Sequence, residues 1–250
     1  VLHVLGRTAH DRAWLMAHDS DALTHQAQAA LDTLTTRRIA GAPLAYLTGH
    51  KEFFGLDLIV DARVLDPRPD TETLVEWALE VLPSTEAARV IDLGTGSGAI
   101  ALALKATRPH LNVVAVDYSN DALTVAQANA QRLSLDVQCI QGSWLDSVPG
   151  RFAAIVSNPP YIRADDRHLE ALIHEPLQAL ASGHDGLDDI RHIIAQAPEH
   201  LEPGGWLLLE HGYDQAAEIR SILQTAGFSQ VQSRLDLAGV ERCSGGSLPR

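Results

Sequence analysis

The residues best suited to chemistry form the run Ser157-Asn158-Pro159-Pro160-Tyr161, which directly follows the apolar stretch 152–156. Such a stretch is typical of a buried strand, and open α/β sheets bind ligands where their strands end. The side-chain oxygen of Asn158 and the backbone carbonyl of Pro159 can each accept a hydrogen bond. Together they could hold both N–H bonds of a planar amino group, with the ring of Tyr161 packed on its face. The run therefore predicts a site that positions an –NH2 group for alkylation; the alternative is a Pro-Pro loop that only ends a strand.

A second motif, Asp92-Leu93-Gly94-Thr95-Gly96-Ser97-Gly98, joins an apolar strand pattern to a helix pattern. Glycines here let the backbone turn sharply and let a ligand approach closely. Asp117 ends the next apolar run, about 20 residues after the glycines, where an acid can accept hydrogen bonds from ribose hydroxyls. The spacing D-x-G-x-G-x-G resembles the first motif of S-adenosylmethionine-dependent methyltransferases. An NAD-binding loop, G-x-G-x-x-G/A, is the alternative, but no hydride-transfer site follows it.

The composition is that of a globular protein: 250 residues, of which 46% are hydrophobic and 20% charged. The net charge of −13 argues against a protein that grips nucleic acid through its phosphates. The apolar runs are too short to cross a membrane, and no signal peptide is recognisable. Cys139 and Cys243 do not make a disulfide framework, which fits a reducing cytoplasm. The twelve histidines lack metal-ligand spacing, so we expect no metal.

The chain divides into three parts by pattern. Residues 1–50 show helical spacing without a strand pattern, which predicts a small helical domain. Residues 51–72 form a linker that contains a β-hairpin, because 51–60 alternate around a central glycine. Residues 73–250 alternate strand and helix patterns, which predicts an α/β domain with a parallel sheet.

Within the α/β domain, an amphipathic helix runs from Leu74 to Leu82, and we expect Asp70-Thr71-Glu72 to cap it. Residues 162–187 show little periodicity and are expected to form a loop over the site. Pro203-Gly204-Gly205 is expected to turn into the fifth strand. The predicted strands lie near 89–93, 112–117, 137–141, 152–157 and 205–210, with more after 228, and the predicted helices near 98–107, 120–132, 188–200 and 214–226.

Nearly the whole chain resembles the bacterial methyltransferases that modify a glutamine of peptide chain release factors, the HemK or PrmC family. Besides the glycine loop, the resemblance includes Glu52-Phe53-Phe54-Gly55-Leu56, Arg68-Pro69-Asp70-Thr71-Glu72, Asn158-Pro159-Pro160-Tyr161, Glu175-Pro176, Asp185-Gly186-Leu187 and Asp236-Leu237-Ala238-Gly239. The Asn-Pro-Pro-Tyr run alone is shared with adenine DNA methyltransferases and with an enzyme acting on a ribosomal protein. The segment that begins at Arg68 points to the release-factor branch.

The resemblance implies a Rossmann-like class I methyltransferase domain with a seven-stranded sheet and S-adenosyl-L-methionine as cofactor. It implies methyl transfer to the side-chain amide nitrogen of the glutamine in the Gly-Gly-Gln motif of release factors. The residues it assigns to the cofactor are Gly94, Thr95, Gly96, Ser97, Gly98, Asp117, Trp144 and Asn158. Those it assigns to the glutamine are Asn158, Pro159, Pro160 and Tyr161, of which Asn158, Pro159 and Tyr161 are expected to act in catalysis.

Two positions depart from the family pattern. Ser143 stands where the family commonly has an acid that accepts a hydrogen bond from the adenine amino group, so stacking on Trp144 is the expected adenine contact that remains. Asp66 stands where an aliphatic residue is usual, and nothing in the sequence explains that change.

An amide nitrogen is a poor nucleophile because its lone pair is delocalised into the carbonyl group. No strong base is evident beside Asn158 in the sequence, and His168, His174 and His184 of the loop are only candidates. We therefore expect positioning and electrostatics to dominate catalysis. The expected partner is a release factor, met by a cytoplasmic monomer without direct nucleic-acid or membrane binding. The alternatives are a glutamine methyltransferase of a ribosomal protein, an adenine-N6 DNA methyltransferase and a non-catalytic scaffold.

Overall fold

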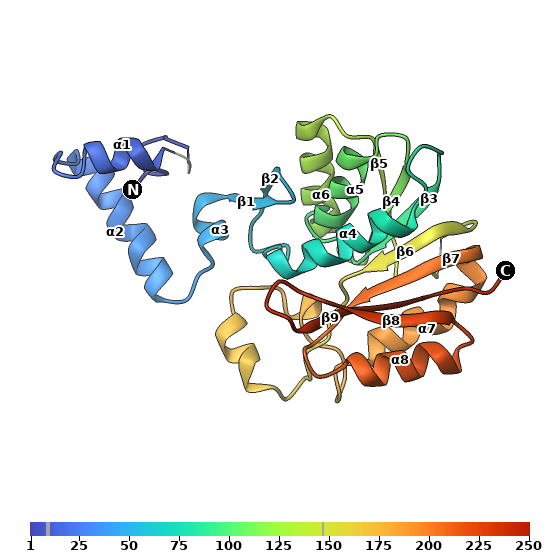
Figure 1. Ribbon diagram of the computed structural model, residues 1–250. Helices are drawn as coiled ribbons and strands as arrows, with labels where there is room; N and C mark the ends of the chain where they lie inside the picture. Colours follow the sequence, from blue (N-terminus) through green and yellow to red (C-terminus); the bar gives the residue numbers. More distant parts are fainter. Residues whose placement is uncertain (9–10, 147) are drawn as a thin grey trace.

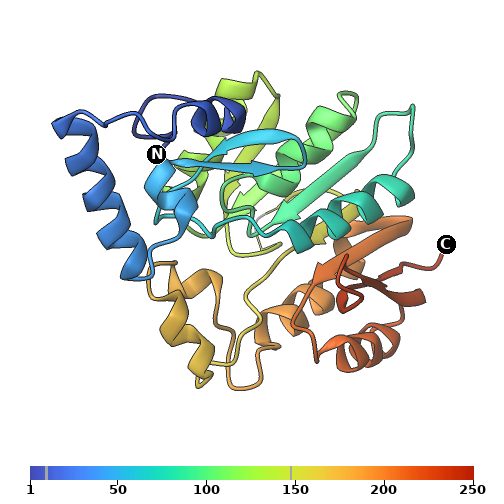
Figure 2. The same cartoon turned by 60° about the vertical axis from the view of Figure 1, so that its left-hand side comes forward.

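The computed structural model describes residues 1–8, 11–146 and 148–250. The chain opens with three helices, α1 (Arg12–Ala17), α2 (His25–Ile39) and α3 (Leu44–Thr48), so the helical start is confirmed. α2 buries none of its residues, and Figure 1 shows α1 and α2 standing away from the sheet. The C-terminal end of α2 lies next to the segment that follows β6 (Figure 2), where a ring nitrogen of His174 is 2.9 Å from the carbonyl oxygen of Ala40.

The predicted hairpin is present as β1 (His50–Phe53) and β2 (Leu56–Ile59), which pair antiparallel. Phe54 and Gly55 make the turn with φ values of 49° and 76°, as a tight two-residue hairpin turn requires. The hairpin is tied to the following segment because the backbone N–H of Phe54 donates to Oε1 of Glu72 at 2.9 Å.

The remaining strands form one seven-stranded sheet of order β5-β4-β3-β6-β7-β9-β8. Neighbours from β5 to β7 are parallel, and β9 pairs antiparallel with both β7 and β8. The strands are β3 (Arg89–Leu93), β4 (Asn112–Asp117), β5 (Val137–Gln141), β6 (Phe152–Ser157), β7 (Leu201–Glu210), β8 (Ser229–Leu235) and β9 (Glu241–Ser247). This architecture confirms the parallel α/β sheet that the sequence pattern predicts and the seven-stranded, Rossmann-like class I methyltransferase domain that the resemblance implies.

Helices cover both faces of the sheet, as a parallel sheet of continuous apolar strands requires. One apolar core lies between the sheet and α4 (Glu72–Val81), α5 (Ala99–Thr107) and α6 (Asn120–Leu133). A second core lies between the other face and α7 (Asp188–His200) and α8 (Ala216–Thr225). Figure 1 shows the two groups of helices on opposite sides. Among the described residues, none of the helices is long and apolar enough to cross a membrane.

One local prediction is wrong, and another holds only in part. Pro203-Gly204-Gly205 is not a turn that precedes the fifth strand, because β7 already begins at Leu201, opposite Phe152. The two glycines lie within β7, where its pairing with β6 shifts register. Gly205 fits there because an added Cβ would lie 2.9 Å from the carbonyl oxygen of Glu202. Asp70-Thr71-Glu72 does lie at the start of α4, with Glu72 in its first turn, but Thr71 makes no side-chain capping bond, because its hydroxyl accepts from Nδ2 of Asn158.

The segment 162–187 is irregular, as predicted, apart from two short 3-10 helices. These are η2 (Arg167–Leu172) and η3 (Leu177–Ala179). A parallel bridge between Ile162 and Ala181 closes the base of the loop. The loop therefore returns to the strand end from which it leaves.

Candidate active site

The two motifs meet because the strands that carry them are neighbours. β3 and β6 pair in parallel with Leu93 opposite Ser157, so the glycine loop and Asn158 leave the same sheet edge side by side. The strand order also reverses at this point, since β4 lies beyond β3 on one side and β7 lies beyond β6 on the other. Open α/β sheets form their ligand crevice at such a reversal.

The glycine loop is held from behind by Asp92. This carboxylate is fully buried and accepts from Oγ1 of Thr95 at 2.6 Å and from the backbone N–H of Ala101 at 3.2 Å. Burial raises the pKa of Asp92 to about 7, and the two hydrogen bonds act against that rise. The loop is thus fixed by groups that face the core, which leaves the backbone of Gly94 and Gly96 toward the cavity.

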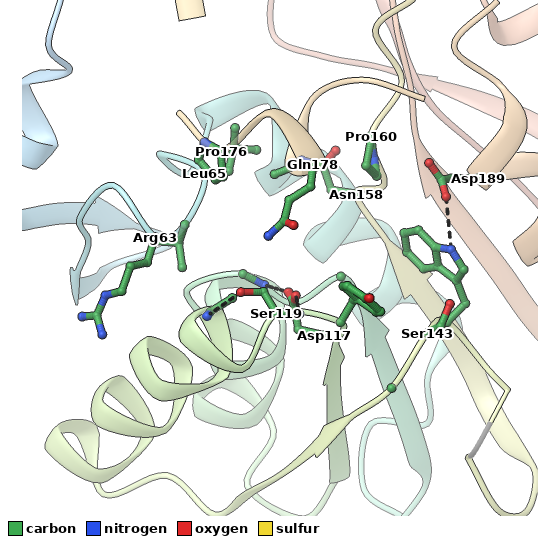
Figure 3. A pocket seen from close by; sticks show the side chains of 18 residues that line it. Arg63, Leu65, Asp117, Ser119, Ser143, Asn158, Pro160, Pro176, Gln178 and Asp189 are labelled. Carbon is green, nitrogen blue, oxygen red and sulfur yellow. Dashed lines mark hydrogen bonds between the residues drawn. The ribbon is translucent and has the colours of Figure 1, made fainter. Parts of the chain in front are cut away.

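Asp117 joins the loop to the end of β4. Its Oδ2 accepts from the backbone N–H of Gly96 at 2.8 Å, and its Oδ1 accepts from the backbone N–H of Ser119 at 2.9 Å. Burial raises the pKa of this carboxyl group above its ordinary value. Figure 3 shows the Asp117 side chain at the base of the cavity, below Gln178.

A cavity of about 280 Å³ lies over these strand ends (Figure 3). Of the residues assigned by resemblance to the cofactor, Gly94, Gly96, Asp117, Trp144 and Asn158 line it. Thr95, Ser97 and Gly98 do not line it, and Thr95 and Ser97 are buried behind the loop. The volume is close to the lower end of small-molecule pockets.

Trp144 forms one wall in a constrained backbone conformation, with a φ of 50°. Its ring nitrogen donates to Oδ1 of Asp189 at 3.2 Å, an interaction drawn in Figure 3. A Cβ added to Gly94 would lie 3.4 Å from the indole, so the ring and the loop pack closely. Ser143 lines the same wall, and Asp189 supplies a carboxylate there from α7.

Asn158 lies where two cavities meet. It lines the larger cavity and also a smaller one of about 100 Å³, which Arg68 and Tyr161 line as well. Pro160 lines the larger cavity, whereas Pro159 lines neither. Two ligands entering from the two cavities would therefore meet at the Asn158 side chain.

Arg68, which lines the smaller cavity, belongs to a group of charges that the sequence did not reveal. Nη2 of Arg68 donates to Oε1 of Glu175 at 2.6 Å, and Glu175 is 8% exposed. Asp66 is 7% exposed and lies 3.2 Å from Nζ of Lys51 and 3.5 Å from Nη1 of Arg68. The unusual acid at position 66 is thus neutralised by two cations, which gives this departure its physical reason.

Other residues that sequence reasoning missed also shape the site. Tyr118, 74% exposed, and Gln178 line the larger cavity, and Figure 3 shows Gln178 pointing into it. Tyr118 could have been found, since it directly follows the acid that ends β4. Asn129 on α6 is fully buried and donates to the carbonyl oxygen of Ser97 at 3.0 Å. It therefore braces the glycine loop from a distant helix.

The candidate bases of the loop lie elsewhere. His168 is exposed and pairs with Asp166 at 2.7 Å, His174 contacts Ala40, and His184 is exposed. None of the three lines either cavity. Within the described residues, no group of three or more His, Cys, Asp or Glu side chains could hold a metal ion.

The residues present fit an S-adenosylmethionine-sized ligand. Such a ligand has three parts, and each part has a matching surface here. The glycine backbone, which lacks Cβ atoms, can take the amino-acid part, the carboxylate at the end of β4 can take the ribose, and the aromatic wall can take the base. The carboxylate is Asp117 and the wall is Trp144, and both open onto the one cavity.

Comparison with known proteins agrees with this geometry. Residues 71–233 match the family described as Methyltransferase small domain, and residues 2–49 match PrmC N-terminal domain. The chain is 50% identical to the release factor glutamine methyltransferase of Bordetella pertussis, over 98% of this chain and 92% of that protein. It is 48% identical to the protein of the same name from Coxiella burnetii, over 92% of this chain and 84% of that one.

A solved methyltransferase from Pyrococcus furiosus has a similar fold, with a TM-score of 0.62 at 19% identity over 89% of this chain and 98% of that chain.

Proposed function

Because the chain belongs to the release factor glutamine methyltransferase family, we propose that it methylates the side-chain amide nitrogen of the glutamine in the Gly-Gly-Gln motif of a peptide chain release factor. The methyl donor of this S-adenosylmethionine-dependent enzyme binds in the larger cavity. The observation that carries the proposal is the place of Asn158, which lines both the larger and the smaller cavity. A glutamine side chain entering the smaller cavity reaches the methyl donor at this amide.

In this proposal, Asn158 and Pro159 act as acceptors. The oxygen Oδ1 of Asn158 and the carbonyl of Pro159 accept the two N–H bonds of the glutamine amide, which fixes its plane and increases electron density on nitrogen. Tyr161 packs on the amide face and is half-buried, with its hydroxyl 3.5 Å from Oε1 of Glu210. The aromatic face also stabilises cationic charge.

S-adenosylmethionine supplies an electrophilic methyl group on a positively charged sulfur. The glutamine nitrogen gains that methyl group, one of its two protons passes to water, and a neutral thioether is left. No histidine of the loop takes part, since His168 and His184 are exposed and His174 contacts Ala40 instead. Alignment of the two reacting groups accounts for most of the acceleration.

The remaining residues take supporting roles in the same proposal. The backbone around Gly94 and Gly96 holds the methionine part of the donor, and Asp117 holds the ribose. Thr95, Ser97 and Gly98 shape the loop without lining the cavity. Trp144 packs on the adenine, and Ser143 and Asp189 offer its amino group two acceptors on the same wall.

We further propose that residues 1–50 recognise the release factor, that 51–72 link the two parts, and that 73–250 carry out catalysis. The exposed helix α2 and the match of residues 2–49 to PrmC N-terminal domain support the first assignment. The enzyme acts as a monomer in the cytoplasm, where release factors work, and Cys139 and Cys243 are both free thiols, as a reducing compartment favours.

The test is methyl transfer from radiolabelled S-adenosylmethionine to three acceptors: an unmodified release factor, ribosomal protein and DNA. We expect label on the release factor alone. A release factor with its Gly-Gly-Gln glutamine changed to asparagine is the matched control and should stay unlabelled. Label only on the ribosomal protein would identify the chain as a glutamine methyltransferase of a ribosomal protein. Label only on DNA would contradict the inference, from the net charge, that the protein does not grip nucleic acid.

A further inference from the structure

A row of polar side chains runs from the cavity wall into the core behind Asn158. The amide nitrogen Nδ2 of Asn158 donates to Oγ1 of Thr71 at 3.2 Å. Thr71 is 4% exposed and lies against the carboxylate of Glu210, the last residue of β7, which is 1% exposed. Oε2 of Glu210 is buried and has no hydrogen-bond partner within residues 1–8, 11–146 and 148–250. The carboxylate thus has an open acceptor position for the one hydrogen of the Thr71 hydroxyl.

The carboxylate of Glu210 determines the donor-to-acceptor direction of the hydrogen bonds in this row. An ionised carboxylate only accepts hydrogen bonds, and a threonine hydroxyl has a single hydrogen to donate. If that hydrogen goes to Glu210, Oγ1 of Thr71 is left as an acceptor, and Asn158 must turn its –NH2 group toward it. The reverse orientation of Asn158 would take the Thr71 hydrogen and leave Oε2 of this buried carboxylate without a donor, since the Tyr161 hydroxyl lies at Oε1, which is unfavourable.

We propose that Thr71 and Glu210 are positioning residues that orient Asn158, so that its oxygen, and not its –NH2 group, faces the substrate amide. The inference rests on the proposed function, because only a substrate that offers N–H groups at this point needs an acceptor there. Neither residue lines the larger or the smaller cavity, and Thr71 reaches the site through its hydrogen bond with Asn158. Thr71 therefore serves Asn158 rather than the cap of α4.

The protonation of Glu210 provides a signature of this role. Burial raises its pKa to about 7, against the lowering effects of the Thr71 hydroxyl, Arg242 and Tyr161, while Asp70 raises it further. Cys243 is the other titratable group that faces it. A protonated Glu210 can donate to Thr71, which removes the constraint on Asn158. The rate should therefore be highest with Glu210 ionised and should fall as the pH drops through its pKa.

The first test compares two substitutions of Thr71. Thr71→Val keeps the shape and removes the hydroxyl, and we expect kcat to fall about 10- to 100-fold with unchanged affinity for S-adenosylmethionine. Thr71→Ser keeps the hydroxyl and should recover most of that loss. Thr73→Val, two residues along, is the matched control, because Thr73 is only partly buried and lines neither cavity. Equal losses in Thr71→Val and Thr71→Ser would overturn the proposal.

Two further measurements separate positioning from folding. In an Asn158→Ala background, Thr71→Val should lower kcat no further, because the group that it orients is gone. Glu210→Gln should lower kcat and remove the acid limb of the pH profile near pH 7. An additive loss in the double variant, or an unchanged acid limb in Glu210→Gln, would contradict the inference. Glu210→Gln also serves as the second variant if Thr71→Val does not fold.

One readout does not depend on the substrate. The side-chain –NH2 of Asn158 gives a nuclear magnetic resonance signal pair, identified by its loss in Asn158→Ala. We expect slow hydrogen exchange of this group in the parent protein at pH 8 and faster exchange in Thr71→Val. Equal exchange in both would overturn the proposed orientation. A parent protein that labels no release factor but passes this test would refute the proposed function alone.

Discussion

Asn129 makes three hydrogen bonds from inside the fold, and its replacement by leucine tests how α6 holds the hairpin and the glycine loop. Its Oδ1 accepts from the N–H of Ile59 at 2.7 Å, and its Nδ2 donates to the carbonyl oxygens of Ile59 at 2.9 Å and Ser97 at 3.0 Å. Asn129→Leu keeps the size of the side chain and leaves three backbone groups without these partners. At about 1–2 kcal/mol for each group, the free energy of unfolding should fall by about 3–6 kcal/mol.

For a chain of this size, about 1 kcal/mol corresponds to roughly 2–4 °C in Tm, so Asn129→Leu should melt about 6 to 24 °C below the parent protein. The assay is thermal and urea unfolding followed by circular dichroism. Gln127→Leu makes a similar polar-to-apolar change on the exposed side of the same helix and should stay within about 0.5 kcal/mol of the parent. A loss in Asn129→Leu no larger than in Gln127→Leu would refute the reasoning, since the freed groups would then have found water.

Three further changes probe the cofactor and substrate sites. Asn158→Ala should lower kcat about 100-fold or more and leave the Kd for S-adenosylmethionine unchanged, measured by calorimetry; equal losses in both would assign Asn158 to the cofactor. Gly94→Ala places a Cβ 3.4 Å from Trp144 at a φ of 69° and should weaken S-adenosylmethionine binding about 10-fold; an unchanged Kd would show that the loop tolerates a side chain. Burial raises the pKa of Glu210 from 4.5 to about 7, so ionisation costs the folded state between these values. Stability is therefore lost as the pH rises through that window, and in urea unfolding the advantage of Glu210→Gln over the parent should grow by about 3 kcal/mol from pH 4 to pH 8. A constant difference would show that Glu210 ionises normally.

The sheet could be predicted closely because its central strands are short runs of apolar residues buried on both faces. The strands 89–93, 112–117 and 152–157 are such runs and have the predicted bounds; the edge strand 137–141, which is only partly buried, has them as well. The start of β7 could not be predicted from the sequence, because Pro203-Gly204-Gly205 has the composition of a turn. Only the pairing of Leu201 with Phe152 makes it part of a strand. Pairing between distant residues leaves no local pattern.

The candidate site likewise contains residues whose positions could be predicted from the sequence and residues whose positions could not. Gly94, Asp117 and Asn158 each follow an apolar run directly, so their positions at one sheet edge could be inferred. Asp189 meets Trp144 across 45 residues of sequence, and Glu175 meets Arg68 across 107, so no spacing rule could bring them together. Glu210 did carry a usable signal, since it is an acid that ends an apolar strand, as Asp117 does.

The contacts of Thr71 and Glu72 bear on how substrate docking is communicated to the chemistry. Thr71 accepts a hydrogen bond from Asn158, and its neighbour Glu72 accepts one from Phe54 at the tip of the hairpin. The hairpin directly follows the N-terminal helices. A displacement of the hairpin would shift Glu72. The peptide bond between Glu72 and Thr71 would pass that shift on to the hydrogen bond between Thr71 and Asn158. Docking of the substrate and the rate of methyl transfer would then depend on each other. Substitutions at the hairpin tip should therefore alter kcat, although the tip lines neither cavity.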